Sequence, residues 1–419
     1  MNETALSRVV IVGAGHAGVE TAAALRQNGF SGEIIMIGEE PDQPYQRPPL
    51  SKEFLKSPQD SSLPLKGEAF YGTNRIELRL GIKVERIERD ERQLVLKGGE
   101  HIAYDHLVLA TGARNRFPPI QGLDASKIFE LRTLAHARSL TERLPDLRRV
   151  AVIGGGFIGL EVAALLRQRD IAVDVIEAAD RLMGRVLSQP MSEAFRAFHE
   201  AMGTKLHLAV MASEITPSGD GFRVLLSSGN EIQADAVVMA AGVVPNVELA
   251  ADAGLAIDNG VVVDAQLLTS DPAISAIGDV ASHPNPYSGG AGHIRLESVQ
   301  NAVDQAKCVA ARLCGKAHDY DVLPWFWSHQ GAIRLQIAGL ATGGDMTVTR
   351  GDPSSEKFSV FVYRGGRLIA VESVNSAADH MIARRLIAAD VSVEPEIAAD
   401  LTADLKVLMP KAPVPKASA

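Results

Sequence analysis

The sequence predicts an α/β protein that contains two copies of a strand–turn–helix–strand unit and a smaller α+β segment at its C-terminal end. The first observation is a β-branched run, a glycine turn and a helical stretch near the N-terminus. The second is the return of this order about 140 residues later, a spacing typical of domain duplication and too long for a solenoid. The third is a change after about residue 320 to short strands separated by glycine pairs.

The first unit begins at residues 8–12, Arg-Val-Val-Ile-Val, a β-branched run that predicts a buried β-strand. Gly13-Ala-Gly15-His-Ala-Gly18 forms its turn, residues 19–27 follow as a helix, and residues 33–37 form the next strand. Two acidic residues come after that strand, and Glu39 stands 26 positions after Gly13.

The second unit repeats each part in order. Residues 149–153 form the strand, Gly154-Gly-Gly156-Phe-Ile-Gly159 the turn, and residues 160–168 the helix. Residues 172–176 form the second strand, which ends at Glu177, 23 positions after Gly154. Each fingerprint thus lies between a strand and a helix and is followed by an acid, which predicts two Rossmann-like dinucleotide-binding domains.

The rest of the chain contains further strands and helices. Residues 107–112 and 236–242 close the two units, and residues 276–279 form a third marker. The C-terminal segment is predicted to hold strands and then helices, at residues 325–327, 335–338, 359–363, 368–371, 376–388 and 396–408. Trp325 and Trp327 are expected on opposite faces of their strand, and both could be core residues.

Composition excludes several classes of protein. The 42 Lys and Arg against 51 Asp and Glu leave a net charge of −9, so a general nucleic-acid binder is not expected. No apolar run reaches about 18 residues, so we expect no membrane span, and without a signal-peptide core we expect a cytoplasmic protein. With 2 cysteines, a disulfide scaffold, a Cys-ligated zinc site and an iron–sulfur cluster are excluded, and no metal site is predicted.

The two glycine turns carry the predicted chemistry. The first glycine of each fingerprint makes the tight turn, the second lets a pyrophosphate approach the backbone, and the third lets helix and strand pack closely. The helix N-terminus then offers free N–H groups to the phosphates. Two such sites imply two dinucleotides, and a flavin with a nicotinamide is the expected pair because hydride passes directly between them. Glu177 would repel a 2′-phosphate, so NADH is expected, while Arg181 and Arg185 nearby leave NADPH open.

These features predict three domains, the first of them discontinuous. Residues 1–115 and 245–320 are predicted to form the first dinucleotide-binding domain, with the second inserted at residues 116–244. Residues 321–408 are predicted to form the C-terminal α+β domain. The proline-rich end, residues 409–419, is predicted to be a disordered tail.

In combination, the motifs of this chain resemble the two-dinucleotide-domain flavoprotein reductases, and among them the NADH-dependent ferredoxin reductases of the putidaredoxin reductase type. The resemblance extends from Val9 to about Leu408 and implies a glutathione-reductase-like architecture. It implies that residues 1–115 and 245–320 form the FAD-binding domain and that residues 116–244 form the NAD-binding domain, with NADH as the substrate. Its markers are residues 44–52, 107–112, 131–133, 154–161, 242–246, 269–272, 277–279, 297–301 and 324–330.

The resemblance also implies roles for individual residues. The FAD pyrophosphate would be contacted by Gly13, Gly15, Ala17 and Gly18, the adenosine ribose by Glu39, and the adenine side by Val84. Lys52, with Arg47 close by, would lie near the flavin ring, Asp279 would bind the ribityl chain, and Val299 would cover the pyrimidine edge. Thr111 and Arg132 would also contact FAD. NADH would be bound by Gly154, Gly156, Ile158, Gly159, Glu161, Glu177, Arg185, Glu297 and Trp327. Lys52 and Glu161 are the expected catalytic residues.

Simpler interpretations stay open for several of these residues. Lys52 could be a solvated lysine after a Pro-Pro turn, and Asp279 could be a helix N-cap. Glu161, placed in the first helix turn, would be favourable there without any ligand.

Relatives with a redox-active cysteine carry it in positions where this chain has none. Residues 44–52 and 116–244 contain no cysteine, and Cys308 and Cys314 are six positions apart in a helical stretch. Six positions turn a helix by roughly 600°, so the two thiols would point apart. They are predicted to be buried and unreactive, which leaves the flavin as the last redox centre of the chain.

The predicted function is therefore that of an FAD-containing NADH:ferredoxin oxidoreductase. Hydride would pass from NADH to FAD, and single electrons would then pass to a transient [2Fe-2S] ferredoxin that serves a cytochrome P450 or a ring-hydroxylating dioxygenase. A rubredoxin reductase and a signalling flavoprotein resembling apoptosis-inducing factor are the alternatives. A monomer or weak dimer is expected, and candidates for a basic docking patch are Arg312, Lys316, Arg384, Arg385, Lys406 and Lys411.

Overall fold

A computed structural model gives the structure of residues 6–60, 63–290 and 292–409. The predicted disordered tail, from residue 410 on, and residues 1–5 lie outside the described residues. The described chain divides into two compact units. Unit 1 contains the described residues up to 49, from 61 to 114 and from 243 to 322, and unit 2 contains those from 50 to 60, from 115 to 242 and from 323 onward.

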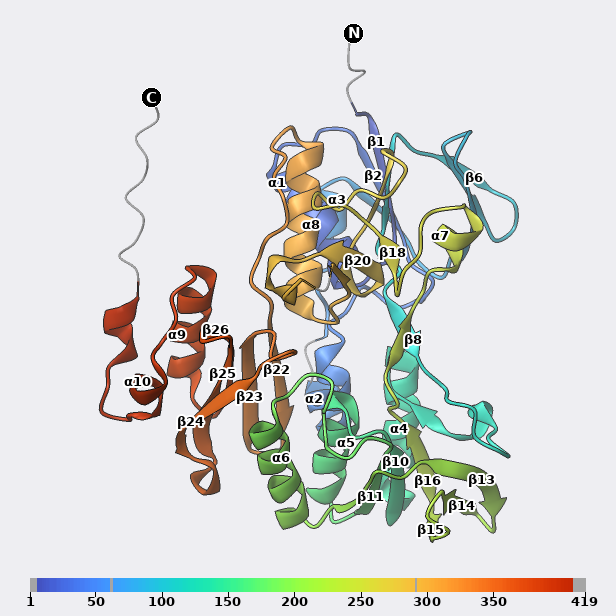
Figure 1. Ribbon diagram of the computed structural model, residues 1–419. Helices are drawn as coiled ribbons and strands as arrows, with labels where there is room; N and C mark the ends of the chain where they lie inside the picture. Colours follow the sequence, from blue (N-terminus) through green and yellow to red (C-terminus); the bar gives the residue numbers. More distant parts are fainter. Residues whose placement is uncertain (1–5, 61–62, 291, 410–419) are drawn as a thin grey trace. The chain divides into compact units, whose positions relative to one another are not determined.

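Unit 1 is built on a five-stranded parallel sheet with the order β19-β7-β1-β2-β3. Its central strands are continuous apolar runs because both faces of a parallel sheet are covered; Val9, Val10 and Ile11 are fully buried. The strands are β1 (Arg8–Val12), β2 (Glu33–Ile37), β3 (Ile76–Arg79), β7 (His106–Leu109) and β19 (Ile274–Ala276). Helices α1 (His16–Gln27) and α8 (Val299–Leu313) pack beside each other in this unit (Figure 1).

Smaller elements complete unit 1. One three-stranded sheet consists of β4 (Val84–Glu88), β5 (Gln93–Leu96) and β6 (His101–Ala103), and a second of β18 (Val261–Val262), β20 (Ala281–Pro284) and β21 (His293–Ile294). A two-stranded ribbon consists of β8 (Ala113–Asn115) and β17 (Val243–Pro245). The short helices are α3 (Ala69–Thr73) and α7 (Glu248–Asp252). The ribbon β17-β8 lies where the chain passes from one unit to the other.

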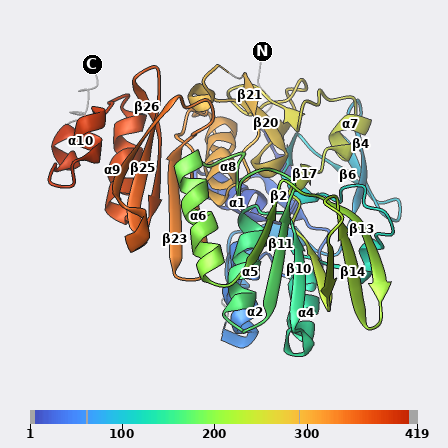
Figure 2. The same cartoon turned by 60° about the horizontal axis from the view of Figure 1, so that its bottom comes forward.

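Unit 2 contains a second parallel sheet, with the order β12-β11-β10-β16-β9. Its strands are β9 (Phe129–Glu130), β10 (Arg149–Ile153), β11 (Ala172–Glu177), β12 (Lys205–Leu208) and β16 (Ala236–Met239), and its helices are α2 (Glu53–Lys56), α4 (Leu134–Arg143), α5 (Phe157–Arg167) and α6 (Gln189–Ala201). The positions of β10, β11 and β16 in the sheet order match those of β1, β2 and β7, so the two predicted strand–turn–helix–strand units are confirmed. Figure 2 shows β10 and β11 side by side in unit 2. The antiparallel sheet β13 (Ala212–Ser218), β14 (Gly221–Leu226) and β15 (Glu231–Ala234) completes this part.

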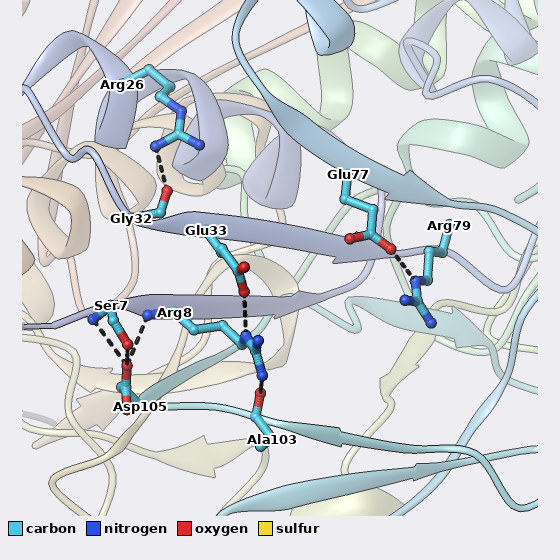
Figure 3. A network of polar contacts seen from close by, with 9 residues as sticks. All are labelled: Ser7, Arg8, Arg26, Gly32, Glu33, Glu77, Arg79, Ala103 and Asp105. Carbon is cyan, nitrogen blue, oxygen red and sulfur yellow. Dashed lines mark hydrogen bonds and ion pairs between the residues drawn. The ribbon is translucent and has the colours of Figure 1, made fainter.

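The duplication includes an aspartate clamp that the sequence analysis missed. Asp105, one residue before β7, accepts hydrogen bonds from the backbone N–H groups of Ser7 at 2.9 Å and Arg8 at 2.8 Å (Figure 3). In unit 2, Asp235, one residue before β16, accepts them from Arg148 at 2.7 Å and Arg149 at 2.8 Å. Each clamp fixes the start of the first strand of its sheet against the start of a neighbouring strand.

The C-terminal part of unit 2 is a five-stranded antiparallel sheet with the order β22-β23-β26-β25-β24. Helix α9 (Ala377–Ala388) packs on this sheet against β23 and β26. The strands, followed by a short helix, are β22 (Trp325–Gln330), β23 (Ile333–Gly339), β24 (Met346–Asp352), β25 (Lys357–Arg364), β26 (Arg367–Val374) and α10 (Pro395–Ala399).

One prediction for the C-terminal segment is wrong, and one strand was missed. The helix predicted at 396–408 is two short pieces, α10 and a 3-10 turn at Leu405–Leu408. Asp400 and Asp404 break it, because their carboxylates accept the backbone N–H groups of Thr402 and Lys406. Strand β24 was not predicted, because its polar sequence lies at the edge of the sheet. Within the described residues, the structure holds no helix that is long and apolar enough to cross a membrane.

Candidate functional site

The first glycine turn joins β1 to α1. Gly13 has a φ of +116°, and a Cβ there would lie 2.1 Å from the carbonyl oxygen of Ala110. A Cβ at Gly18 would lie 1.9 Å from the carbonyl oxygen of Gly13, so helix and turn touch at this position. Gly15, by contrast, has no atom within 4 Å of the place of a Cβ. The turn therefore needs the outer two glycines for its own packing and leaves open space at the middle one.

The space beside this turn is a small pocket of about 40 Å³. Its lining comes from the glycine turn and from the segment after β2, and consists of Ala14, Gly15, Gly38, Glu39, Glu40, Asp42, Pro44, Tyr45 and Arg47. Glu39 is exposed, with its carboxylate 4.0 Å from the ammonium of Lys83. Arg47, predicted to bind the cofactor, lies in the same wall.

Glu40 is a residue of this pocket that the site prediction left out. Its carboxylate accepts hydrogen bonds from the hydroxyl of Tyr45 at 2.5 Å and from Nη2 of Arg47 at 2.7 Å. Arg47 also donates to the Tyr45 hydroxyl at 3.2 Å and lies over its ring. Glu40 thereby fixes Arg47, and the signal available in the sequence was the second acid directly after Glu39.

The second glycine turn, between β10 and α5, repeats the geometry of the first. Gly154 has a φ of +114°, and a Cβ there would lie 2.3 Å from the carbonyl oxygen of Ala240. A Cβ at Gly159 would lie 2.2 Å from the carbonyl oxygen of Gly154, whereas Gly156 again has nothing within 4 Å. Ile158, in the first turn of α5, is half-buried.

The acids that follow the second strands do not occupy matching positions. Gly13 donates to the carbonyl of Ile37 and Gly154 to that of Ile176, both at 2.8 Å, so Glu177 corresponds to Gly38 and not to Glu39. The carboxylate of Glu177 accepts the N–H of Gly155 at 2.6 Å and that of Ala179 at 2.8 Å. Glu177 is therefore fixed against its glycine turn.

The two arginines that left NADPH open behave differently. Arg181 turns back on its own loop and donates to the carbonyls of Leu187 at 2.6 Å and Gly184 at 2.7 Å. Arg185 is exposed, and its Nη2 lies 3.4 Å from the place of a Cβ on Gly242. Arg181 is thus part of the loop's structure, and Arg185 is the arginine that faces outward.

Lys52 and Glu161, the predicted catalytic pair, are in contact within unit 2. The ammonium of Lys52 lies 2.7 Å from Oε2 of Glu161, and their side chains are 14% and 5% exposed. The same carboxylate accepts hydrogen bonds from the hydroxyls of Ser51 at 2.5 Å and Ser328 at 2.6 Å. The interpretation of Lys52 as a solvated lysine is wrong, and the sequence analysis missed both serines.

Two further expectations need correction. Glu161 is the fifth residue of α5 and not in its first turn, because the helix begins at Phe157. Trp325 and Trp327 lie on the same face of β22, with ring centroids 5.3 Å apart, because residues two apart in a strand point to one side. Both rings are half-buried.

The remaining predicted site residues are spread over other elements. Asp279 is in a 3-10 turn, Gly278–Val280, so it is not a helix N-cap; Ser298 is the N-cap of α8, which Val299 begins. Glu297 forms an ion pair with Arg295 at 2.7 Å. Thr111 and Arg132 are half-buried, and the hydroxyl of Thr111 donates to the carbonyl of Asn246 at 2.9 Å. Val84 is buried at the start of β4, and Ala17 is buried in α1.

The two cysteines do not form a redox pair. Cys308 is buried in α8, Cys314 is half-buried at its end, and both are free thiols. Burial raises the pKa of Cys308 to about 11 and raises that of Cys314 as well, so thiolates are disfavoured at both positions. Among the described residues, no group of three or more His, Cys, Asp or Glu side chains is placed to hold a metal ion.

Comparison with protein families gives two matches. Residues 7–306 match the family model described as pyridine nucleotide-disulphide oxidoreductase. Residues 325–409 match a second model, described as reductase C-terminal.

Similar proteins of known function are reductases. A rhodocoxin reductase from Rhodococcus erythropolis is 49% identical over 401 residues, which cover 95% of this chain and 93% of the relative. The ferredoxin–NAD(+) reductase component of an anthranilate 1,2-dioxygenase system from Burkholderia cepacia is 43% identical, with 96% and 98% covered. A rubredoxin-NAD(+) reductase from Pseudomonas putida is 40% identical, with 88% and 95% covered.

Two solved structures match nearly the whole chain. A ferredoxin reductase for the CYP199A2 system from Rhodopseudomonas palustris superposes with a TM-score of 0.93 and 48% identity, covering 96% of this chain and all of the other. The covalent complex of putidaredoxin reductase with putidaredoxin gives a TM-score of 0.92 and 37% identity, covering 96% of this chain and 98% of the matched chain. These likenesses agree with the duplicated α/β fold described above.

Proposed function

The chain belongs to the pyridine nucleotide-disulphide oxidoreductase family, and from this premise we propose that it is an FAD-dependent NAD(P)H:ferredoxin reductase. The observation that carries the proposal is the pair of glycine turns, each with packed outer glycines and an open middle glycine at a helix N-terminus. Such a turn exposes backbone N–H groups and the positive end of a helix dipole to a pyrophosphate. Two of them serve two dinucleotides.

The residues of unit 1 fit FAD. The open space at Gly15 admits a pyrophosphate, with Gly13, Ala17 and Gly18 shaping the turn around it. Glu39 and the pocket beside it would hold the adenosine ribose, and Arg47 is fixed by Glu40. The other residues of unit 1 that would hold the cofactor are Val84, Thr111, Asp279 and Val299, and the resemblance adds Arg132, which belongs to unit 2. When bound, FAD supplies the exchange between a hydride donor and a carrier that takes single electrons.

The residues of unit 2 fit the nicotinamide dinucleotide. Gly156 offers its open space to the pyrophosphate, and the fixed carboxylate of Glu177 is an acceptor for ribose hydroxyls. A carboxylate held in this way disfavours a 2′-phosphate, so NADH is the proposed substrate. Arg185, the outward-facing arginine, would contact the dinucleotide, and Ile158 and Trp327 complete the proposed set in unit 2. The resemblance adds Glu297, which belongs to unit 1.

Glu161 and Lys52 act as a charged pair in this proposal. Three donors surround the Glu161 carboxylate, from Ser51, Lys52 and Ser328, so it serves as a fixed anionic acceptor. It holds the ammonium of Lys52 in one place and keeps that positive charge in a largely buried site. The resemblance to the flavoprotein reductases gives Lys52 a role at the flavin and Glu161 a role at the nicotinamide, so the two remain the proposed catalytic residues.

The proposed partner is a [2Fe-2S] ferredoxin that binds transiently and serves a P450 or a ring-hydroxylating dioxygenase. Among the predicted docking residues, Arg312 is unsuitable, because it is partly buried and donates to the hydroxyl of Ser275 at 2.6 Å. Arg384 lies over the ring of Trp325, and Lys411 is outside the described residues. Lys316, Arg385 and Lys406 are exposed and remain candidates for the docking patch. We also propose a monomeric or weakly dimeric state and a cytoplasmic location.

The test is electron transfer from NADH to purified [2Fe-2S] ferredoxins in a stopped-flow spectrometer. We expect a yellow protein with flavin absorbance, reduction of that absorbance by NADH, and ferredoxin reduction well above the rate that free FAD supports. A colourless protein that takes up no added flavin would overturn the proposal.

Rubredoxin reductase is the second candidate, favoured by the 40% identical relative from Pseudomonas putida. A rubredoxin in the same stopped-flow panel separates the two, since the physiological carrier is reduced faster at equal concentration. A reduced-flavin complex with NAD that turns over negligibly with either carrier would instead favour the signalling flavoprotein.

A further inference from the structure

The loop between β11 and α6, residues 178–188, lies directly against the second glycine turn. The backbone N–H of Met183 donates to the carbonyl of Gly155 at 3.0 Å, while the N–H of Gly155 donates to Glu177 at the start of the loop. Leu182 is fully buried and lies next to Gly155, at 2.8 Å from the place of a Cβ there. A shift of this loop therefore shifts the turn that would bind the pyrophosphate.

The conformation of the loop is imposed by its surroundings. Met183 has a φ of +51°, in the left-handed region that a bulky side chain rarely adopts. Such a backbone persists only where other contacts determine it. Arg181 supplies contacts from inside the loop, through the carbonyls of Gly184 and Leu187. The hydroxyl of Ser192, in α6, supplies another by donating to the carbonyl of Leu182 at 2.6 Å.

The end of the loop is held from the C-terminal sheet by Glu372, a fully buried carboxylate of β26. Its Oε1 accepts the backbone N–H of Ser188 at 2.8 Å, and its Oε2 accepts the Ser188 hydroxyl in a short hydrogen bond. Ser188 is the N-cap of α6, but its hydroxyl makes no capping bond to the helix and donates to Glu372 instead. Both donors of Ser188 are thus committed to one carboxylate.

We propose that Glu372 is a positioning residue of the dinucleotide site in unit 2, which acts through Ser188 and the β11–α6 loop on the second glycine turn; this role rests on the proposed function. The connection is continuous: Glu372 holds Ser188, Arg181 braces the loop, and Met183 bonds to Gly155. Gln330 of β22 adds a contact, with its Nε2 3.7 Å from Sδ of Met183. Glu372 thereby sets how well NADH binds without itself touching the nucleotide.

The test compares Glu372→Ala, Glu372→Gln and Ser188→Ala with Ser373→Ala as the matched control. Ser373 is the next residue of β26, equally buried, and its hydroxyl bonds to Ser359 within the C-terminal sheet. Ser373→Ala should reduce stability without changing any contact of the β11–α6 loop. Glu372→Gln keeps an oxygen for the Ser188 N–H and an amide that can bond to its hydroxyl, so it is the conservative variant.

Steady-state oxidation of NADH with ferricyanide gives KM and kcat, and calorimetry with ADP-ribose gives binding independently of turnover. We expect Glu372→Ala to raise KM and the ADP-ribose Kd about five-fold, because a factor of this size corresponds to the net contribution of one hydrogen bond. The kcat should stay within about two-fold of wild type. Ser188→Ala, which keeps its N–H, should give a smaller rise, and Glu372→Gln should stay near wild type.

Two outcomes overturn the inference, and they are distinguishable. If Glu372→Ala changes KM and Kd no more than Ser373→Ala at equal loss of thermal stability, the carboxylate is merely structural and the inference alone is wrong. If wild-type protein neither oxidises NADH nor binds ADP-ribose, the proposed function is wrong and the inference falls with it.

Discussion

At the scale of single residues, Glu161 shows how a buried carboxylate is accommodated in the fold. Burial removes water from its oxygen atoms, and three donors, from Ser51, Lys52 and Ser328, take the place of that water. The family resemblance predicted Lys52 and Glu161 but neither serine, because a serine becomes a hydrogen-bond partner only once the fold brings it within reach. Ser328 is 167 positions from Glu161, and no local pattern records that distance.

Lys52→Met should destabilise the protein because it leaves the Glu161 carboxylate buried without its cation. The Glu161 side chain is 5% exposed and would keep only its two hydroxyl donors, so we expect a loss of about 3 kcal/mol in the free energy of unfolding. Urea unfolding at neutral pH measures it. The double variant Lys52→Met/Glu161→Gln removes the stranded charge and should recover more than half of the loss. A double variant as unstable as the single one would show that the charge is not the cause.

Glu372 should make stability depend on pH. Burial raises its pKa to about 7, against the hydrogen bonds from Ser188 and the charge of Arg181, which lower it. Between its usual pKa of about 4.5 and 7 the folded protein binds more protons than the unfolded chain, so stability falls as pH rises through this window and levels off above it.

A shift of this size corresponds to about 3 kcal/mol. Glu372→Gln cannot titrate, so its stability relative to wild type should improve by up to this amount between pH 4.5 and 8. Urea unfolding of both proteins across that range measures it. A difference that does not change with pH would mean that Glu372 titrates normally.

At the scale of secondary-structure elements, the repeated strand–turn–helix–strand unit was predictable and the C-terminal elements were less so. The buried runs of β1 and β10 and the glycine turns after them are local signals, and they match the structure within a few residues. Strand β24 lacks such a run. The guanidinium of its buried Arg350 forms an ion pair with Asp379 at 3.7 Å. It also binds the carbonyls of Ala398, Asp400 and Ala403, which lie about 50 positions away in the chain. These bonds also take up carbonyls near the place where the predicted helix at 396–408 breaks.

The glycine turns predict opposite outcomes for two neighbouring substitutions. Gly156→Ala meets no atom and has a φ of −84°, which alanine adopts freely, so the protein should fold with nearly wild-type stability. The new methyl group occupies the space proposed for the pyrophosphate, so KM for NADH should rise about ten-fold or more. Gly154→Ala places its Cβ 2.3 Å from the Ala240 carbonyl oxygen and should not give folded protein.

Thermal unfolding and NADH titration of the two variants measure both effects. The matched pair in unit 1 is Gly15→Ala, which should fold but retain less FAD, and Gly13→Ala, which should not fold. Wild-type nucleotide affinity in Gly156→Ala would show that no phosphate approaches this turn.

At the scale of the whole molecule, the chain forms two compact units, whereas the sequence predicted three domains. The division into residues 1–115 with 245–320, 116–244 and 321–408 stays a prediction. Within unit 2, buried polar contacts join the second parallel sheet and its helices to the C-terminal sheet: Ser328 with Glu161, His199 with Gln330, and Ser188 with Glu372. These pairs are far apart in the chain, so boundaries drawn from sequence could not anticipate them.

The whole-molecule scheme requires that no thiol takes part in electron transfer, although the family is described as pyridine nucleotide-disulphide oxidoreductases. Cys308 and Cys314 are both in or at the end of α8, and burial raises the pKa of each, so neither supplies the thiolate that disulfide chemistry needs. The double variant Cys308→Ala/Cys314→Ala should therefore reduce ferredoxin with a kcat within about two-fold of wild type, after a modest loss of stability from the buried Cys308. Iodoacetamide at pH 8 should leave wild-type turnover equally unaffected. A hundred-fold loss of kcat in the folded double variant would place a thiol on the electron path and remove the flavin as the last redox centre of the chain.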